Sequence, residues 1–260
     1  MSKIGSPLFI LRDECQKDFM QVIEKLGELG FDGIELFGIF GHKPADVRKK
    51  LDSCGLEAVG DHVPFNEFAT NTAKVIDEHK ELGCKFLTLS APESGGLPGG
   101  ENYARTLETI EKIGEKMKQA GMTLLYHNHA EEPRSIINGK AALEHLMDDA
   151  PALSLEADLG WIQIGGGDPM HYLEKYKDRC PIVHFKDFIP AKPGGEADFY
   201  FRPTGYGVVR NAELYAKTLE FDTPPAWYVM DHDCAYTRDI YWDLKISVEY
   251  FRNLMLMYGC

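Results

Sequence analysis

Short apolar runs alternate with longer amphipathic segments along the chain, and this alternation occurs eight times. Each run is rich in β-branched and aromatic residues, which is typical of a strand. Each following segment repeats its apolar positions every three to four residues, which is typical of a helix. The expected strands begin at Pro7 (PLFILR), Asp32 (DGIELFG), Glu57 (EAVGDHVP), Lys85 (KFLTLSAP), Thr123 (TLLYHNH), Leu153 (LSLEADLG), Pro181 (PIVHFKD) and Ala226 (AWYVMDHD). The expected helices cover residues 18–29, 45–54, 72–82, 103–120, 140–148, 170–177, 212–220 and 240–257.

Strands that alternate with helices predict a parallel sheet covered by helices. Eight such units in about 250 residues are typical of a closed (β/α)8 barrel. The competing open, doubly wound sheet has fewer strands and often a GxGxxG turn after the first one, whereas RDECQKD stands at that place here. We therefore predict an α/β protein, a (β/α)8 TIM barrel that forms a single domain over residues 1–260. Glycines are expected to end four of the helices, at Gly30, Gly55, Gly83 and Gly121.

Composition narrows the class of partner. The 260 residues are 44% hydrophobic, and 28 basic against 41 acidic residues give a formal net charge of −13. That charge repels phosphate backbones and anionic lipid, so we expect neither a nucleic-acid nor a membrane partner. The chain has no run of about 18 apolar residues and its N-terminal segment does not resemble a secretory signal, which favours a cytoplasmic protein. Six cysteines without a CxxC pair are expected to be reduced and structural.

Polar side chains occupy the inward-facing positions near the ends of the later strands. Because side chains alternate across a strand, each set below shares one face. Five strands that agree in face and end predict a functional pocket at the carboxyl end of the barrel, where barrel active sites are built. The sets are Leu125, His127 and His129; Glu156 and Asp158; Ile182, His184 and Lys186; Val229, Asp231 and Asp233; and, from earlier strands, Glu35, His62 and Ser90.

These residues suit a divalent metal ion. The candidate ligands are Asp158, Asp231 and His184, together with His127 or His129. A mixed nitrogen and oxygen set favours Mn²⁺, Zn²⁺, Co²⁺ or Fe²⁺ over Ca²⁺, and Mg²⁺ is also possible. An ion with open positions polarises a carbonyl and binds neighbouring hydroxyls of a sugar.

At these residues the chain resembles the xylose-isomerase-like TIM barrels, the sugar phosphate isomerase/epimerase superfamily. The resemblance covers essentially the whole chain and is carried by ELGFDGIEL, YHNH, LEADLGWIQIGGGDP, VHFKD and WYVMDHD. It implies one divalent cation, held by a Glu, an Asp, a His and a second Glu on strands five to eight. The Asp corresponds to Asp158 and the His to His184. The sequence departs from this pattern at the two glutamates, which are replaced by His127 and Asp231.

The resemblance implies three functions that the sequence leaves open. The first is a metal-dependent isomerase or epimerase that acts on a sugar, sugar phosphate or keto-sugar by proton abstraction through an enediolate. The YHNH segment resembles a branch with inosose dehydratases and 3-keto-glycoside-cleaving proteins, so the second is a lyase or dehydratase on a keto-sugar, keto-inositol or 3-keto-glycoside. The third is a non-catalytic sugar-binding barrel or one subunit of a heteromer. A nuclease at abasic DNA shares the barrel, but the charge of −13 argues against it. A homo-oligomer is possible.

Further residues are candidates for catalysis and substrate binding. His129 or His62 is expected to remove the proton, and Lys186 either stabilises the enediolate or pairs with Asp187 or Glu156. Trp161 is expected to form an apolar wall for a sugar ring or to pack in the core. Glu35 is a candidate for substrate binding or for anchoring the barrel floor. Residues 188–210 are predicted to form a long loop in which Arg202 clamps a phosphate or carboxylate, or contacts another subunit.

Overall fold

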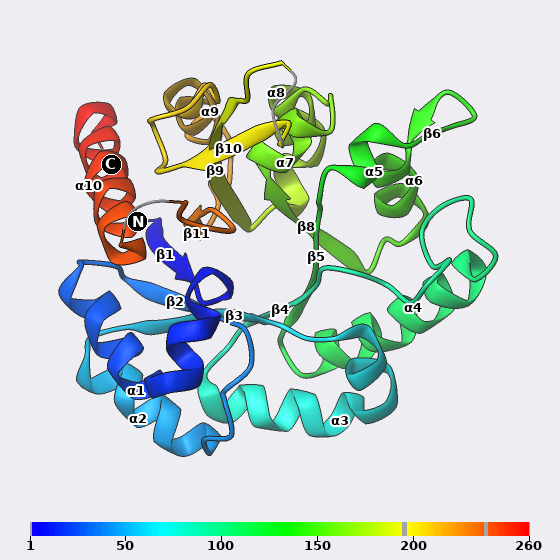
Figure 1. Ribbon diagram of the computed structural model, residues 1–260. Coiled ribbons are helices and arrows are strands. Elements are labelled where there is room, and N and C mark those ends of the chain that lie inside the picture. The colour runs from blue at the N-terminus through cyan, green and yellow to red at the C-terminus, as the bar shows by residue number, and fades with distance from the viewer. Residues whose placement is uncertain (1, 194–196, 237–238, 260) are drawn as a thin grey trace.

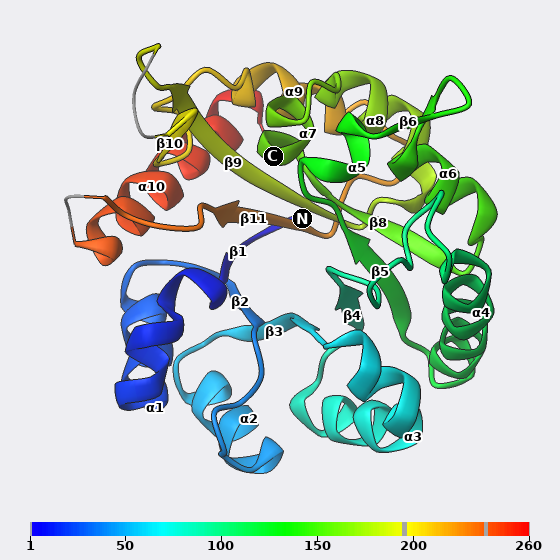
Figure 2. The ribbon, with the colours of Figure 1, turned by 45° about the vertical axis from the view of Figure 1, so that its right-hand side comes forward.

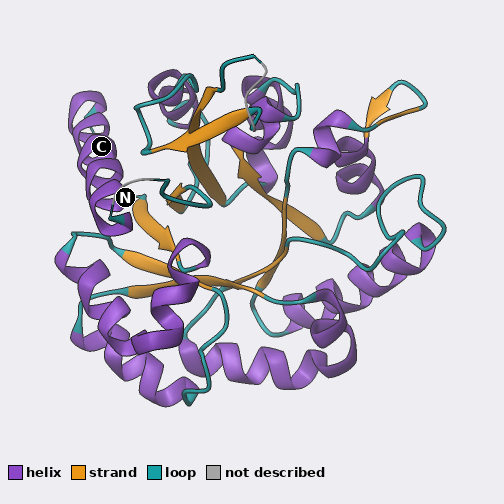
Figure 3. Ribbon diagram, in the orientation of Figure 1, coloured by secondary structure: helices purple, strands orange, loops and turns teal. Residues whose placement is uncertain are grey.

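We describe the protein from a computed structural model, in which residues 2–193, 197–236 and 239–259 are placed. Within these residues, eight parallel strands close into a barrel that is surrounded by helices (Figures 1 and 3). Pairing of the last strand with the first closes the ring, so the predicted (β/α)8 barrel is confirmed. In barrel order the strands are β1 (Lys3–Pro7), β2 (Gly33–Leu36), β3 (Glu57–His62), β4 (Phe86–Leu89), β5 (Thr123–His127), β8 (Leu153–Asp158), β9 (Ile182–Pro190) and β11 (Trp227–Asp231).

The helices lie outside the barrel and bury one apolar face against it (Figure 2). The four glycines predicted to end helices all have positive φ, and Gly83 ends α3 at a φ of 84°. The larger helices are α1 (Arg12–Glu28), α2 (Pro44–Ser53), α3 (Phe65–Leu82), α4 (Tyr103–Gln119), α6 (Ala142–Asp149), α8 (Pro169–Tyr176), α9 (Asn211–Thr218) and α10 (Ile240–Tyr258). Shorter elements are η1 (Phe9–Leu11), α5 (Glu131–Arg134), the hairpin of β6 (Ile136–Ile137) and β7 (Lys140–Ala141), α7 (Leu159–Ile164), η2 (Lys177–Arg179) and β10 (Phe199–Arg202).

Two predicted segments are wrong. The first strand is β1, which ends at Pro7, where the prediction began it; the apolar run after it forms the 3-10 turn η1 and leads directly into α1. A short buried apolar run has no period that separates a strand from a helical turn. The segment 188–210 is not one long loop, because β9 continues to Pro190 and pairs with the antiparallel strand β10. Residues 194–196 of that segment lie outside the described residues.

The floor of the barrel is an apolar layer built around Trp227, which is 6% exposed. Its partners are Val59, Leu125, Ile182 and Val229, with Phe86 packed against them. Glycine is required opposite the indole, because a Cβ on Gly33 would lie 2.6 Å from the Trp227 ring. The floor closes the amino-terminal end of the barrel beneath the polar residues, which leaves the carboxyl end for the pocket.

An irregularity in β3 decides which of its side chains enters the barrel. Ile34 pairs with Ala58, but the next residue of β2, Glu35, pairs with Gly60, so Val59 is an extra residue in β3. Such a bulge shifts the alternation of side chains along the strand. Val59 therefore lies in the floor and His62 reaches the pocket, although the two are three residues apart.

The remaining features agree with the composition. No helix among the described residues is long and apolar enough to cross a membrane. The five described cysteines are free thiols, as expected, and Cys15, Cys84 and Cys180 are buried. Cys260 lies outside the described residues.

Candidate active site

A pocket with a cavity volume of about 140 Å³, partly open to solvent, lies at the carboxyl ends of the strands. Its lining combines imidazole, carboxylate and ammonium groups with an apolar group of residues from the first two strands. The lining residues are Pro7, Leu8, Phe9, Glu35, Leu36, Phe37, His62, Ser90, His127, His129, Trp161, His184, Lys186, Asp231 and Asp233.

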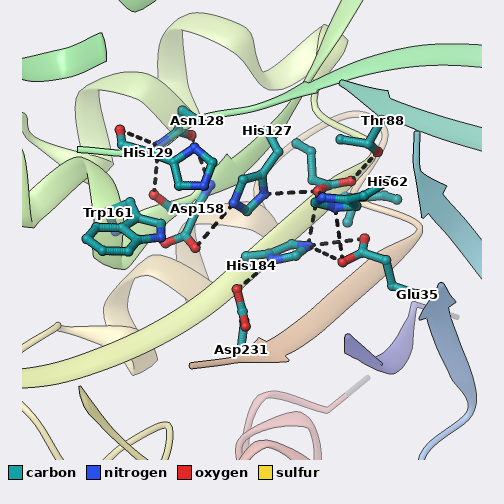
Figure 4. A network of polar contacts seen from close by, with 12 residues as sticks. Glu35, His62, Thr88, His127, Asn128, His129, Asp158, Trp161, His184 and Asp231 are labelled. Atoms are coloured by element: carbon teal, nitrogen blue, oxygen red, sulfur yellow. Dashed lines mark hydrogen bonds and ion pairs between the residues drawn. The ribbon is translucent and has the colours of Figure 1, made fainter. Parts of the chain in front are cut away.

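Four predicted metal ligands come together beside this pocket. His127, Asp158, His184 and Asp231 each present one ligand atom, and these atoms lie within 4.8 Å of one another. All four side chains are buried, and they come from four neighbouring strands, β5, β8, β9 and β11. Figure 4 shows His127 at the centre of the network, with His184 and Asp231 below it. The sequence left His127 and His129 as alternative ligands, and the structure places His127 in the set.

Hydrogen bonds hold Asp158 in place, from its backbone to the Asn128 side chain and from its carboxylate to the start of α7. The Asn128 side chain accepts a hydrogen bond from the Asp158 N–H at 3.0 Å and donates one to its carbonyl at 3.3 Å. One carboxylate oxygen of Asp158 caps α7 by accepting the Trp161 N–H at 2.8 Å. The other oxygen, Oδ2, is buried and accepts no hydrogen bond within the described chain. It faces the ammonium of Lys186, whose Nζ is 3.1 Å away, so a metal ion at this oxygen would compete with that group.

The two histidine ligands are oriented by carboxylates behind them. His127 Nδ1 lies 3.0 Å from Glu156 Oε1, and His184 Nε2 lies 3.1 Å from Glu35 Oε2. Carboxylates that hold the far nitrogen of an imidazole fix the tautomer of a metal-binding histidine. The other nitrogens face the ligand carboxylates: His127 Nε2 is 3.8 Å from Asp158 Oδ2, and His184 Nδ1 is 3.1 Å from Asp231 Oδ2.

The donor set fits a divalent metal ion. Asp231 Oδ1, like Asp158 Oδ2, is buried and has no hydrogen-bond partner in the part of the chain that is described. A second group of potential ligands is formed by His62, Glu156 and the same two histidines. The Glu156 oxygens are already engaged there, since they accept bonds from the Thr88 hydroxyl and from imidazole nitrogens. In the first set Asp231 Oδ1 has no such partner among the described residues, which makes that set the better candidate for the metal.

Lys186 brings a positive charge to the same carboxylates. Its side chain is 1% exposed, and Nζ lies 3.1 Å from both Asp158 and Asp231 and 2.6 Å from Asp233. Burial lowers the pKa of Lys186, but the three carboxylates outweigh that effect and raise it. Burial raises the pKa of Asp158 to about 7, against the opposing charge of Lys186. The predicted partners of Lys186, Asp187 and Glu156, are wrong.

Two histidines near the ligand set have opposite surroundings. His62 Nε2 lies 2.8 Å from Glu156 and 3.3 Å from Glu35. Burial by itself lowers the pKa of His62, but the charges of these two glutamates exceed that effect and raise it to about 10. Burial and the charge of Lys186 lower the pKa of His129 to about 4. The two glutamates therefore favour the protonated form of His62, and burial favours the neutral form of His129.

His129 is aimed into the pocket by the turn after β5. Glu132, a buried residue of α5, accepts the His129 backbone N–H at 3.0 Å and the Tyr126 hydroxyl at 2.6 Å. The imidazole lies against the Trp161 ring, with 6.0 Å between centroids. Trp161 in turn packs against the aromatic residues of β10, at 5.5 Å from Phe201. The predicted wall residue therefore lines the pocket next to the candidate base.

The other predicted residues are divided between the pocket and its surroundings. Glu35 lines the pocket, where it contacts both His62 and His184, and it does not lie in the floor. Arg202 does not line the pocket, and its guanidinium bonds the Phe201 carbonyl at 2.7 Å. Its role as a clamp stays a prediction. Sequence reasoning placed Glu156 on the inward face, two residues before Asp158, but gave it no role in the site. It missed the network residues Thr88 and Asn128.

Comparison with known proteins places the chain in a family. A family model described as xylose isomerase-like TIM barrel matches residues 23–227, and the chain belongs to this family. An inosose dehydratase from Geobacillus kaustophilus is 23% identical, over 90% of this chain and 87% of the relative. A solved sugar phosphate isomerase/epimerase from Parabacteroides distasonis has a TM-score of 0.77 at 20% identity, covering 97% of this chain and 94% of that chain. A solved probable 3-DHS dehydratase from Bacillus anthracis has a TM-score of 0.73 at 15% identity, covering 96% and 99%.

These comparisons confirm the superfamily inferred from the sequence motifs. The curated relatives are enzymes, and the chain is an enzyme of this family. The non-catalytic alternative finds no support. Two of the curated relatives are named inosose dehydratases.

Proposed function

We propose that this protein is a divalent-metal-dependent dehydratase that removes water from a keto-sugar or keto-inositol ring. The observation that carries the proposal is the placement of a candidate base and a candidate acid on opposite sides of one metal-type ligand set. In Figure 4, His129 and Trp161 lie on one side of His127, and His62 and Glu35 lie on the other. The ring centroid of His127 lies 5.1 Å from that of His62 and 5.1 Å from that of His129.

A divalent ion bound by His127, Asp158, His184 and Asp231 would polarise the substrate ketone and so acidify the neighbouring C–H. His129 takes the proton from the carbon next to the ketone, because its imidazole is neutral and open to the pocket. The electron pair of that C–H bond forms a carbon–carbon double bond as the hydroxyl on the next carbon departs. His62 gives its proton to that hydroxyl, so the products are an unsaturated ketone and water.

Glu156 and Glu35 complete this assignment. They keep His62 protonated before the reaction, since their carboxylates lie 2.8 Å (Glu156) and 3.3 Å (Glu35) from its Nε2. Two titratable groups whose environments push their pKa values apart are a general sign of acid and base roles. The ammonium of Lys186 lies within the pocket lining and adds positive charge for the oxygen that becomes negative. Trp161 supplies an apolar face for the C–H side of the ring.

A dehydratase and an epimerase share the first step, and they differ in the second. An epimerase returns the proton from the opposite face of the same carbon, whereas a dehydratase needs an acid at the leaving hydroxyl. His62, whose protonated form is stabilised by Glu156 and Glu35, supplies that acid. The names of the curated relatives favour the same choice.

The test is an assay with 2-keto-myo-inositol and the Mn²⁺-loaded protein. We expect loss of one water from the substrate, followed by mass spectrometry, and no loss after removal of the metal with EDTA. Asp158→Ala and His184→Ala should abolish both the reaction and Mn²⁺ binding. Arg105→Ala, which removes an exposed ion pair with Glu93, is the matched control and should leave both unchanged. A metal-free wild-type protein with the same activity would contradict the proposal.

A further inference from the structure

The pocket has an apolar half that the proposed chemistry does not use. Two phenylalanines line it at the mouth, Phe9 from η1 and Phe37 directly after β2. Phe9 is 39% exposed and Phe37 is 41% exposed. Among the large apolar side chains that are exposed in the described residues, these two alone line the pocket. We call this pair the phenylalanine rim.

The rim is held in a fixed arrangement. The two rings meet edge to face, with centroids 5.2 Å apart and planes at 83°. The Arg12 guanidinium lies 4.6 Å from the Phe9 ring and donates a hydrogen bond to the Phe9 carbonyl at 2.8 Å. On the other side, Gly38 follows Phe37 with a φ of 73°, and its N–H is bound by Asp61 at 2.9 Å. Exposed rings that are fixed in this way are ready to bind without a large ordering cost.

The rim lies to one side of the place of the keto ring. The ligand set, His129 and Trp161 belong to β5, β8, β9 and β11 and the segments that follow them, whereas the rim residues follow β1 and β2, which are neighbours in the barrel (Figure 1). The two groups adjoin where β1 pairs with β11. The hydroxyls of a sugar find hydrogen-bond partners in the polar half. Phenyl rings offer no such partners, and they gain from contact with apolar or aromatic surface. Leu8 and Leu36 line the pocket on the same side, so this half is mainly apolar, with the carboxylate of Glu35 as the exception.

We infer that the phenylalanine rim is a binding subsite for an apolar or aromatic substituent carried by the substrate ring. This inference rests on the proposed function for the position of the ring, and it makes a substituted keto-sugar, such as the keto form of an aryl glycoside, a tighter-binding substrate than a free keto-inositol. The subsite lies on the side of His62, because Phe37 follows two residues after Glu35, whose carboxylate is 3.3 Å from that imidazole.

The test compares two glycosides that have no ketone and therefore cannot undergo elimination. Isothermal titration calorimetry gives the Kd of the Mn²⁺-loaded protein for phenyl β-D-glucopyranoside and for methyl β-D-glucopyranoside. We expect the phenyl compound to bind about tenfold more tightly. In the double variant Phe9→Ala, Phe37→Ala this preference should fall below about threefold, with methyl glucoside affinity unchanged. Tyr258→Ala is the matched control, since Tyr258 is 45% exposed and does not line the pocket.

Several outcomes would overturn the inference. They are equal affinities of the wild type for the two glycosides, no binding of either, and a phenyl preference that survives in the double variant. Light scattering adds another: a dimer that dissociates in the double variant, without a change in glycoside affinity, would assign the rim to contact between two copies of the chain. Circular dichroism verifies that the variants fold. Turnover of 2-keto-myo-inositol is scored separately, so a dehydratase without a phenyl preference refutes the inference alone, and a phenyl preference without dehydration refutes the proposed function alone.

Discussion

Replacement of Lys186 by methionine removes one buried positive charge and leaves three carboxylates facing one another. The ammonium lies 3.1 Å from Asp158, 3.1 Å from Asp231 and 2.6 Å from Asp233. Methionine keeps the length and the apolar stem of the side chain, so the substitution tests the charge with little change in packing. We expect Lys186→Met to destabilise the metal-free protein strongly.

The magnitude follows from the distances. At an effective dielectric constant of about 20, one pair of unit charges about 3.1 Å apart attracts by roughly 5 kcal/mol. The cost of removing an ammonium ion from water offsets several kcal/mol of the sum over three pairs. Breaking a buried ion pair by removal of one partner costs about 3–5 kcal/mol, because the remaining charge stays buried and unpaired. We therefore expect the free energy of unfolding to fall by about 3–5 kcal/mol in the absence of metal.

Mn²⁺ should reverse much of this loss. Two of the three carboxylates belong to the proposed metal ligands, so the ammonium and the ion compete for the same negative charge. Lys186→Met should therefore bind Mn²⁺ more tightly than the wild type, and saturating Mn²⁺ should restore stability through preferential binding to the folded state. Urea unfolding with Mn²⁺ or with EDTA measures the first effect, and calorimetric titration with Mn²⁺ measures the second.

Lys140→Met is the control, because Lys140 forms an ion pair with Asp148 on the surface, and such pairs contribute little. An equal loss of stability with Mn²⁺ and with EDTA would refute the reasoning. Weaker binding of Mn²⁺ by Lys186→Met would refute it as well, because it would show that the ammonium supports the metal site and does not compete with the ion.

Three further predictions concern the base, the floor and a buried ion pair. His129→Gln should lower kcat for dehydration by about 10²–10⁴ with an unchanged Kd for Mn²⁺; a loss of metal binding would make His129 a ligand and contradict its role as base. Gly33→Ala should lower the free energy of unfolding by about 1–3 kcal/mol, because the new methyl group meets the Trp227 ring at 2.6 Å. An unchanged urea unfolding curve would contradict this prediction, because it would show that the Trp227 ring moves aside at no cost. Burial lowers the pKa of His79, but the carboxylate of Asp61, 2.9 Å from its Nε2, exceeds that effect and raises it. A group whose pKa is raised by folding stabilises the folded protein fully at pH values below its pKa in the unfolded chain. That contribution is lost as the pH rises through its pKa in the folded protein. His79→Gln should therefore cost more stability at about pH 5.5 than at about pH 9.5. An equal cost at both pH values would contradict the charged pair.

The fold and the candidate metal ligands were accessible from the sequence because both follow from alternation along strands. Asp158, His184 and Asp231 each lie near the end of a strand on its inward face, and this position is fixed once the strand is recognised. The choice between His127 and His129 needed the structure, because the two share a face and the sequence left either as the ligand. The structure brings His127 into the candidate ligand set, and Glu132 fixes the turn that holds His129.

The errors arise where local pattern and tertiary pairing disagree. The apolar residues after Pro7 have the composition of a strand, but they form η1 because β1 already pairs with β2 through Pro7. The bulge at Val59 cannot be read from the alternation of β3, since it is defined by the register with β2. The partners of Lys186 were missed for the same reason, because Asp187, its neighbour in sequence, points away from the pocket and accepts the backbone N–H groups of Gly205, Gly207 and Val209.

The most direct test of the proposed function is a proton NMR time course of 2-keto-myo-inositol with the Mn²⁺-loaded protein in D₂O, recorded on quenched, metal-free samples. We predict loss of the signal of the proton next to the ketone together with the appearance of the unsaturated ketone, both absent in His129→Gln. Exchange of that proton for deuterium with the hydroxyls retained would show an isomerase or epimerase, and it would contradict the dehydratase.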